Sequence, residues 1–131
     1  MPHSGIRYLS CDDILELHDG VIGRYGGMPG IRDQDAITSC VAQPKTAVFG
    51  EERFPTIFDK AAAYCYFIVR MHPFFDANKR TGLAAAYAFL VDHGATPGFE
   101  ESAMYDAILR IACGKMEIEE LADLFQRSAI G

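Results

Sequence analysis

The sequence lacks the features that mark membrane-spanning, exported or nucleic-acid-binding proteins. No run approaches the roughly 18 uncharged apolar residues that cross a bilayer, and the first residues hold no apolar core of signal-peptide length. Basic residues are few: 12 Lys and Arg against 18 Asp and Glu give a net charge of −6, which disfavours contact with nucleic acid or anionic lipid. These absences predict a soluble, cytoplasmic protein that binds neither nucleic acid nor membrane.

Cysteine pairs with metal-binding or redox spacing are also absent. The four cysteines are scattered along the chain, and none belongs to a C-x-x-C motif. Cys40, Cys65 and Cys113 fall in apolar periodic stretches, which is typical of cysteine as a small buried residue. The histidines do not have the spacing of zinc ligands either. We therefore expect a reduced protein without a cysteine or histidine metal centre.

Internal repeats, linkers and low-complexity segments are absent as well. The 131 residues are 50% hydrophobic and 23% charged, a composition typical of a globular protein that folds on its own. This length suits one hydrophobic core. We expect a single domain over residues 1–131.

Helical periodicity, bounded by capping residues, is the main pattern that is present. Apolar residues recur at helical spacing in six stretches, which predicts an all-α fold: a compact bundle of about six helices. Ser10, Asp33, Thr56 and Ser102 each precede such a stretch and are predicted to be helix N-caps. The side-chain oxygen of each would accept a hydrogen bond from a free backbone N–H group of the first turn.

Two of the six stretches are apolar on most sides. They cover residues 57–71 and about 78–93, and we expect them to form the buried centre of the bundle. Residues 45–55 have no helical period. Their apolar pairs around a central glycine predict a short β-hairpin flap between the second and third helices.

The segment between the two apolar helices is difficult to explain by packing alone. Lys79 and Arg80 fall in the first turn of the fourth helix, where the helix dipole disfavours a cation by roughly 0.3–1 kcal/mol. A bound anion removes this conflict, because free N–H groups, an ammonium and a guanidinium together bind phosphate. Asp76 lies beside them. Mg²⁺ is usually held by one or two carboxylates together with substrate phosphates, so this residue is a candidate magnesium ligand.

A candidate general base stands at the start of the same segment. His72 precedes Pro73, which predicts an extended backbone at His72 directly after the third helix. The ring would then lie next to the anion site. An imidazole changes its protonation near neutral pH and can draw a proton from an attacking hydroxyl. Phe74 is expected in the core, where it would anchor the loop.

From the residues alone, a purely structural interpretation stays open. Phe74 would be a core residue, Asn78 an N-cap, and His72 a hydrogen-bonded turn residue. Lys79 and Arg80 would then form a solvated helix face.

The run from His72 to Thr81 resembles the signature of the Fic/Doc family. This signature is H-P-F-x-[DE]-G-N-G-R-x-x-R in the AMP-transferring Fic members and H-x-F-x-D-A-N-K-R-T in the Doc toxins. The pair Leu17-His18 and residues 24–33 are also similar to the amino-terminal part of Doc proteins. The resemblance covers essentially the whole chain and implies a bacterial protein with the helical Fic/Doc fold.

Three positions follow the Doc pattern and not the Fic pattern. Ala77 and Lys79 stand at the two motif glycines, and Leu83 stands at the last Fic arginine. The resemblance therefore implies a toxin that transfers the γ-phosphoryl group of ATP to a hydroxyl of the translation factor EF-Tu and arrests translation. Pro73 agrees instead with the Fic pattern. Fic-type AMP transfer to a protein hydroxyl is the alternative activity, and a catalytically silent binding module is the alternative without chemistry.

The resemblance also implies a role for each residue of the run. His72 would be the general base on the target hydroxyl, and Asp76 would orient this histidine or bind Mg²⁺. Lys79 and Arg80 would neutralise the charge that develops during transfer from ATP. The nucleotide- and phosphate-binding residues would be Ala77, Asn78, Lys79 and Arg80.

Two partner sites follow from the resemblance. Residues 48–54 correspond in place to the family's flap, which aligns a target peptide by strand addition. The docking residues would be Val48, Phe49, Gly50 and Phe54. The sequence has no inhibitory [ST]-x-x-x-E-[GN] motif. We therefore expect control by a separate antitoxin, as Doc's partner Phd supplies a carboxy-terminal segment that folds into a groove on the toxin.

Overall fold

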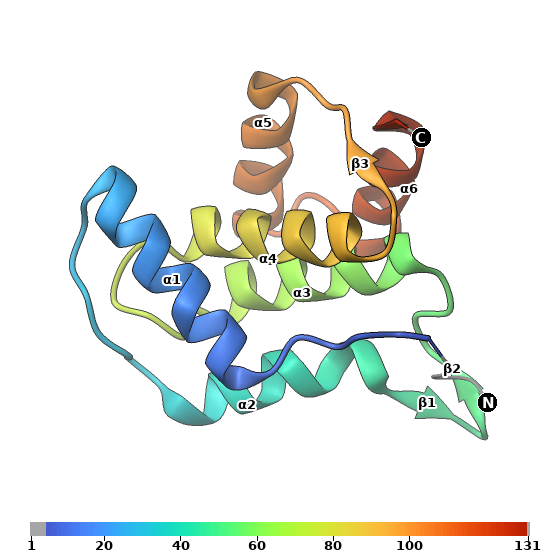
Figure 1. The fold of residues 1–131 in the computed structure, drawn as a ribbon, viewed down its shortest axis with the longest axis horizontal. Coiled ribbons are helices and arrows are strands. Elements are labelled where there is room, and N and C mark those ends of the chain that lie inside the picture. Colours follow the sequence, from blue (N-terminus) through green and yellow to red (C-terminus); the bar gives the residue numbers. More distant parts are fainter. Residues whose placement is uncertain (1–4, 131) are drawn as a thin grey trace.

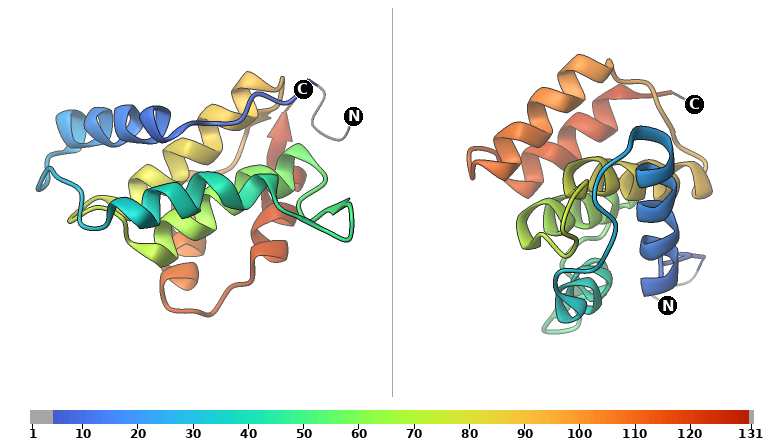
Figure 2. Two further views of the ribbon diagram at one scale, coloured as in Figure 1. Left: turned by 90° about the horizontal axis from the view of Figure 1, so that it is seen from below. Right: turned by 90° about the vertical axis from the view of Figure 1, so that its left-hand side faces the viewer.

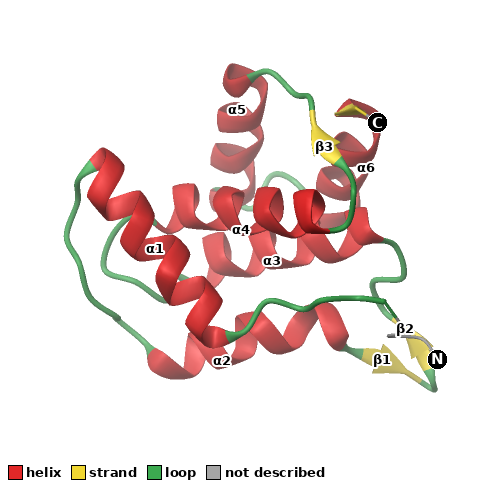
Figure 3. Ribbon diagram, viewed as in Figure 1, coloured by secondary structure: helices red, strands yellow, loops and turns green. Residues whose placement is uncertain are grey.

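The computed structural model describes residues 5–130, and within this range the chain forms six α-helices joined by short connections (Figure 1). The helices are α1 (Cys11–Tyr25), α2 (Gln34–Ala42), α3 (Ile57–Met71), α4 (Asn78–Asp92), α5 (Glu101–Ala112) and α6 (Ile118–Ser128), and the 3₁₀ helix η1 (Gln43–Lys45) follows α2. The short strands are β1 (Ala47–Val48), β2 (Glu51–Glu52), β3 (Thr96–Pro97) and β4 (Ala129–Ile130). Figure 3 shows that helices dominate the fold, which confirms the predicted helical bundle.

Helices α3 and α4 lie side by side at the centre of the molecule. Figure 2 shows α5 and α6 on one side of this pair and α1 and α2 on the other. Small residues allow the two central helices to approach closely: a Cβ atom at Gly82 of α4 would lie 3.0 Å from the carbonyl oxygen of Cys65 in α3. The loop that joins α3 to α4 therefore starts and ends on the most buried elements of the fold.

Three of the four predicted N-caps are confirmed. Ser10 accepts a hydrogen bond from the Asp13 N–H at 3.1 Å, and Thr56 accepts one from the Asp59 N–H at 3.0 Å. In both cases the aspartate carboxylate accepts the N–H of the capping residue in return, which completes a capping box. Asp33 caps α2 through the Ala36 N–H at 3.2 Å. The sequence therefore fixes the starts of α1, α2 and α3.

The fourth predicted cap is wrong. Helix α5 begins at Glu101, and its N-cap is Glu100, whose backbone is still extended. Ser102 lies inside the first turn. The extended segment after β3 ends at Glu100, so the chain becomes helical two residues before the expected start. The N-cap residue makes no side-chain hydrogen bond to the first turn.

The cysteine predictions hold at two of three positions. Cys40 and Cys65 are fully buried, whereas Cys113 is exposed because it follows the last turn of α5 as its C-cap. Burial raises the pKa of the Cys40 thiol to about 12, so this thiol stays protonated and unreactive near neutral pH. All four cysteines are free thiols.

The predicted hairpin is present between η1 and α3. Its strands pair antiparallel, with Ala47 opposite Glu52 and Val48 opposite Glu51. Phe49 and Gly50 form the turn with φ values of 51° and 79°. A second antiparallel pair, β3 with β4, was not predicted, because its two short strands come from distant parts of the sequence.

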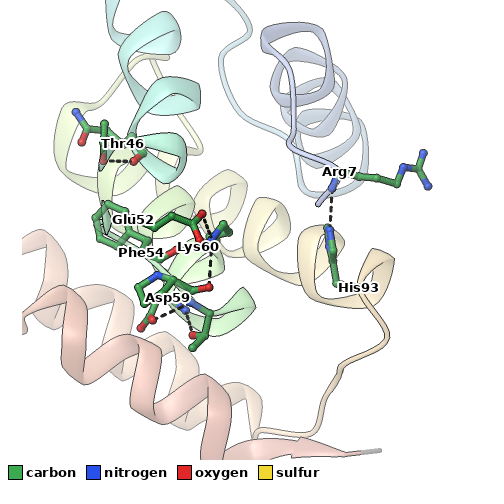
Figure 4. A network of polar contacts seen from close by, with 10 residues as sticks. Arg7, Thr46, Glu52, Phe54, Asp59, Lys60 and His93 are labelled. Carbon is green, nitrogen blue, oxygen red and sulfur yellow. Dashed lines mark hydrogen bonds and ion pairs between the residues drawn. The ribbon is translucent and has the colours of Figure 1, made fainter. Parts of the chain in front are cut away.

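A buried lysine ties this hairpin to the amino-terminal end of α3 (Figure 4). The Lys60 Nζ atom donates to Glu52 Oε1 at 3.0 Å and to the carbonyl oxygens of Phe54 and Pro55 at 2.5 and 3.3 Å. Only 1% of the Lys60 side chain is exposed, and these hydrogen bonds offset the cost of burying its ammonium group. In the part of the chain that the structure describes, no helix is long and apolar enough to cross a membrane.

Candidate active site

The candidate site is the loop of residues 72–77 and the first turn of α4 that follows it. His72 begins the loop and is exposed. Its backbone is left-handed, with φ 55° and ψ 56°, so the expected extended conformation is wrong. The following proline favours extended backbone locally, and the contacts of the folded chain override this preference. The His72 N–H still donates to the Ile68 carbonyl oxygen at 3.2 Å, so the helical hydrogen bonds of α3 continue up to this residue.

This backbone conformation is strained. A left-handed conformation costs an L-amino acid roughly 1–2 kcal/mol, and histidine has no glycine-like freedom to avoid that cost. Strain of this kind persists only where surrounding contacts fix the residue. Such contacts are present on both sides of His72, and they come from α1 and from the segment between α1 and α2.

Phe74 fixes the middle of the loop in the core. Its side chain is fully buried, and its ring stacks on the His18 ring with centroids 3.7 Å apart and planes 5° apart. The Phe74 N–H donates to Asn78 Oδ1 at 3.0 Å, and Asn78 Nδ2 donates to the Phe74 carbonyl oxygen at 3.0 Å. The Asn78 side chain is buried and is used to close the loop. Its predicted role in binding phosphate stays a prediction.

Asp76 holds the second half of the loop. Its Oδ1 atom accepts the Ala77 N–H at 2.8 Å, and its Oδ2 atom accepts the Met28 N–H at 3.0 Å. These two bonds, first the Met28 bond and then the Ala77 bond, lower the pKa of Asp76 below its ordinary value; the nearby His18 and Arg80 act in the same direction. The carboxylate is therefore ionised at neutral pH. No hydrogen bond joins it to His72 among the described residues, so the predicted orienting contact is not seen.

An ionised, exposed carboxylate fits the role of a magnesium ligand. Each Asp76 oxygen accepts one N–H group and retains a lone pair. Within residues 5–130, no cluster of three His, Cys, Asp or Glu side chains could hold a metal without other ligands. Mg²⁺ bound here would need phosphate oxygens and water to complete its octahedral shell, which is its usual mode of binding.

The segment of residues 26–33 lies along the loop and was missed as part of the site. Ile31 and Phe74 form an isolated antiparallel bridge, and the Phe75 N–H donates to the Gly30 carbonyl oxygen at 3.3 Å. A glycine is required at position 27, where φ is 125° and a Cβ atom would lie 2.9 Å from Asp76 Oδ2. The glycines of residues 26–33 predict a turn in this segment. They do not predict that the segment contacts the loop of residues 72–77.

Helix α4 presents an uncapped amino terminus to the end of the loop. Its N-cap is Ala77, a left-handed residue with φ 66° whose side chain has no group to bond the first turn. Within residues 5–130 no side chain caps this turn, so its first N–H groups are available to an external acceptor. Lys79 and Arg80 lie in this turn, as predicted. Arg80 is exposed, and its guanidinium carbon lies 4.2 Å from the centroid of the Tyr25 ring in α1.

A groove of about 980 Å³ runs between α1, α4 and α5, with Lys79 and Arg80 in its lining. Apolar side chains from α1 and α4, including Leu17, Val21 and Leu83, line its walls. His72 is not among its lining residues. The loop and the groove are therefore two neighbouring surfaces that share the first turn of α4.

The hairpin that was predicted to dock the target lies elsewhere. It is fixed to the amino-terminal end of α3 by Lys60, whereas His72 follows the carboxy-terminal end (Figure 1). Because α3 has 15 residues, its two ends are about 22 Å apart. The structure therefore does not bring the predicted docking residues next to His72; these are Val48, Phe49, Gly50 and Phe54. Their predicted role in docking stays a prediction.

The fold and the site define a helical domain in which a short loop joins an exposed histidine to an uncapped helix terminus that carries Lys79 and Arg80. The model of the Fic/DOC family matches residues 8–90, which run from the residues before α1 almost to the end of α4, and the chain belongs to this family. The Fic/Doc resemblance inferred from the sequence is thus confirmed.

Two curated relatives are similar over nearly the whole chain. "Protein kinase doc" of Escherichia phage P1 is 33% identical over 122 residues, which cover 93% of this chain and 95% of the relative. "Toxin Doc" of Mycolicibacterium smegmatis is 32% identical over 118 residues, which cover 88% of each chain. Both relatives belong to the Doc group, as the Ala77 and Lys79 positions predicted.

Proposed function

We propose that this chain is a Doc-like toxin and an enzyme that transfers the γ-phosphoryl group of ATP to a hydroxyl of an EF-Tu-like translation factor. The observation that carries the proposal is the placement of Lys79 and Arg80 in the uncapped first turn of α4, directly after the loop that begins at His72. The relative from phage P1 is named a protein kinase, which supports phosphoryl transfer.

In the proposed reaction, His72 accepts the proton of the target hydroxyl while the hydroxyl oxygen attacks the γ-phosphorus of ATP. The bond between the γ-phosphorus and the bridging oxygen breaks, and ADP leaves. Lys79, Arg80 and the N–H groups of the first turn stabilise the charge on the phosphate oxygens. Asp76 would hold Mg²⁺, which neutralises phosphate charge when bound. The phosphorylated factor would no longer support translation.

Intact-mass spectrometry tests this proposal. Purified EF-Tu is incubated with the chain, ATP and Mg²⁺, with the His72→Ala variant as the control. A gain of about 80 Da indicates phosphoryl transfer, and a gain of about 329 Da indicates AMP transfer. Because His72 is exposed, its truncation leaves the core packing intact, and circular dichroism should show the same helix content for both proteins.

Each result has a distinct meaning. A gain of about 80 Da that requires His72 supports the kinase proposal, whereas a gain of about 329 Da replaces it with Fic-type AMP transfer. No gain with either protein rejects EF-Tu as the target. If cell growth is then inhibited equally by both proteins, the chain acts as a catalytically silent binding module.

We also propose that a separate, Phd-like antitoxin segment occupies the groove between α1, α4 and α5. An amphipathic helix binds such a groove through its apolar face, and the groove offers apolar walls of suitable size. The lining holds as many acidic as basic side chains, and the basic residues Arg24, Lys79 and Arg80 belong to the last turn of α1 and the first turn of α4. An acidic group on the segment would be favoured next to these three residues. An antitoxin bound there would cover the first turn of α4 and compete with ATP for its N–H groups.

A further inference from the structure

A guanidinium group from outside the signature run holds the backbone of His72. Arg32 lies between α1 and α2, 40 residues before His72 in sequence. Its Nε atom donates to the His72 carbonyl oxygen at 2.6 Å, and its Nη2 atom donates to the Met71 carbonyl oxygen at 2.8 Å. The two carbonyl groups are consecutive, so one planar side chain bridges the last residue of α3 and the first residue of the loop.

The geometry of this contact suits arginine and no other residue. Nε and Nη2 are two fixed donors on one side of the guanidinium plane, and they can bond two neighbouring acceptors at the same time. The carbonyl groups at the end of a helix have no partners within the helix and carry partial negative charge, which attracts a cation. Both bonds therefore favour the backbone conformation in which the Met71 and His72 carbonyl groups point towards the Arg32 guanidinium.

This arrangement matters because the His72 backbone is left-handed at φ 55° and ψ 56°. An extended backbone at this position would rotate the His72 carbonyl group and break the Arg32 contact. It would also change the direction of the bond from Cα to Cβ, and so move the imidazole. The pair of bonds from Arg32 Nε and Nη2, called the Arg32 fork from here on, thus opposes the change in the φ and ψ of His72 that would displace the imidazole ring.

We infer that Arg32 is a positioning residue that keeps His72 in the left-handed conformation and thereby places the general base. The catalytic consequence rests on the proposed phosphoryl transfer, whereas the conformational consequence does not. Loss of the fork would misplace the base without removing any group that touches ATP.

The contact can be removed without removing the segment that carries it. The Arg32 N–H donates to the Pro73 carbonyl oxygen at 2.8 Å, and the Asp33 N–H donates to the same oxygen at 3.0 Å. These backbone bonds and the Ile31–Phe74 bridge do not need the Arg32 side chain. The Arg32 side chain is exposed, so its truncation creates no cavity.

The test compares Arg32→Met, which keeps an unbranched apolar side chain but has no donor, with Arg32→Lys, which has one charged group in place of the guanidinium. Arg127→Met is the matched control, since Arg127 is an exposed arginine on α6 whose partner is Asp123. Nuclear magnetic resonance chemical shifts of the His72 backbone report φ and ψ in the full chain without ligand. Steady-state kinetics of EF-Tu phosphorylation report kcat and the KM for ATP.

For Arg32→Met we expect the His72 shifts to move from left-handed towards extended values, and kcat to fall by about tenfold to a hundredfold. The KM for ATP should change less than about twofold, because no phosphate contact is lost. Arg32→Lys should lie between the wild type and Arg32→Met, and Arg127→Met should match the wild type. A merely structural role would lower the melting temperature but leave the His72 shifts and kcat of the folded protein unchanged.

Two outcomes would overturn the inference. Unchanged His72 shifts in Arg32→Met would show that the fork does not set the conformation, and shifted resonances with wild-type kcat would show that the conformation does not place the base. If the wild-type chain does not phosphorylate EF-Tu, the proposed function fails. The chemical shifts then still decide whether Arg32 holds His72.

Discussion

The ring of His18 lies flat on the ring of Phe74, and its Nε2 atom lies 3.0 Å from the carbonyl oxygen of Asp76. Nε2 must carry a hydrogen to make this bond, because a carbonyl oxygen only accepts. One buried side chain of α1 therefore contacts both the anchor of the loop and the residue that precedes Ala77. Together with Arg32, it fixes the loop from a part of the chain that lies outside the signature run.

Replacement of His18 should loosen this loop. His18→Ala leaves the Asp76 carbonyl group without its donor and removes the ring that covers Phe74. We expect the free energy of unfolding to fall by about 2–4 kcal/mol, from the lost hydrogen bond and the cavity together. Urea denaturation at neutral pH measures this change.

His18→Gln serves as the control for the hydrogen bond, because its amide can donate in place of Nε2 but cannot stack as a ring. It should recover part of the lost stability. Equal stability of His18→Ala and the wild type would contradict the packing role.

The contribution of Asp76 to stability should depend on pH. Its two backbone hydrogen bonds hold its pKa below the ordinary 3.8 in the folded protein. A carboxylate of this kind stabilises the fold at any pH above the ordinary value, and the contribution disappears as the pH falls through the lowered pKa. Asp76→Asn, whose side chain has only one acceptor oxygen, should therefore be less stable than the wild type near neutral pH.

The stability difference between these two proteins should shrink as the pH falls below 3.8. Urea unfolding at several pH values between about 6 and 3 gives the required curves. A difference that stays constant over this range would show that the Asp76 carboxylate is not held by the Met28 and Ala77 N–H groups.

Two glycines should respond in opposite ways to the same substitution. A Cβ atom at Gly82 in α4 would lie 3.0 Å from both the Cys65 carbonyl oxygen and Val69 Cγ2, whereas a Cβ atom at Gly20 in α1 meets nothing within 4 Å. Gly82→Ala should lower the free energy of unfolding by about 1–3 kcal/mol through overpacking. Gly20→Ala should raise it by about 0.5–1 kcal/mol, because alanine restricts the unfolded chain and favours the helix. Chemical denaturation of both variants tests the pair, and destabilisation by Gly20→Ala would contradict it.

The Thr81 hydroxyl offers a stabilising substitution. Its Oγ1 atom is buried in α4 and has no hydrogen-bond partner within the described residues. Thr81→Val replaces the hydroxyl with a methyl group of similar size, so it should raise the free energy of unfolding by about 1–2 kcal/mol. Thr38→Val on α2 is the control, because that hydroxyl is exposed and should change stability little. A less stable Thr81→Val would indicate that the hydroxyl has a partner after all, such as an ordered water.

Local features of the fold could be predicted from the sequence, because each depends on neighbouring residues. The start of α3 follows from Thr56 and Asp59, which complete their capping box within four residues. The position of Lys79 in the first turn of α4 also follows from local sequence, because Pro73 interrupts the helical pattern and the next apolar helical stretch begins near Asn78. The motif residues of the loop were therefore identified without any long-range contact.

Features that join distant segments could not be predicted. The Arg32 fork and the His18 stack each connect residues more than 35 positions apart, and nothing in the local pattern marks their partners. The hairpin at residues 47–52 was predicted correctly as a hairpin, but its position depends on Lys60, which looked like one of few charges on an apolar helix. The left-handed backbone of His72 could not be predicted, because the local preference before proline is extended and the Arg32 contacts that accompany the left-handed backbone come from a distant segment.

The groove supplies the final prediction. Ala88 of α4 lies among its lining residues and is half buried. Ala88→Arg would place a long, charged side chain in the groove, and we expect it to prevent binding of a Phd-like antitoxin segment. The variant should therefore inhibit growth even when that antitoxin is expressed with it. Ala42→Arg at the end of α2 is the control, because Ala42 is exposed and outside the groove. If the antitoxin fully protects cells that express Ala88→Arg, the antitoxin binds another surface. If protection is lost while toxicity is unchanged, the groove binds the antitoxin and is not needed for the activity of the loop that begins at His72.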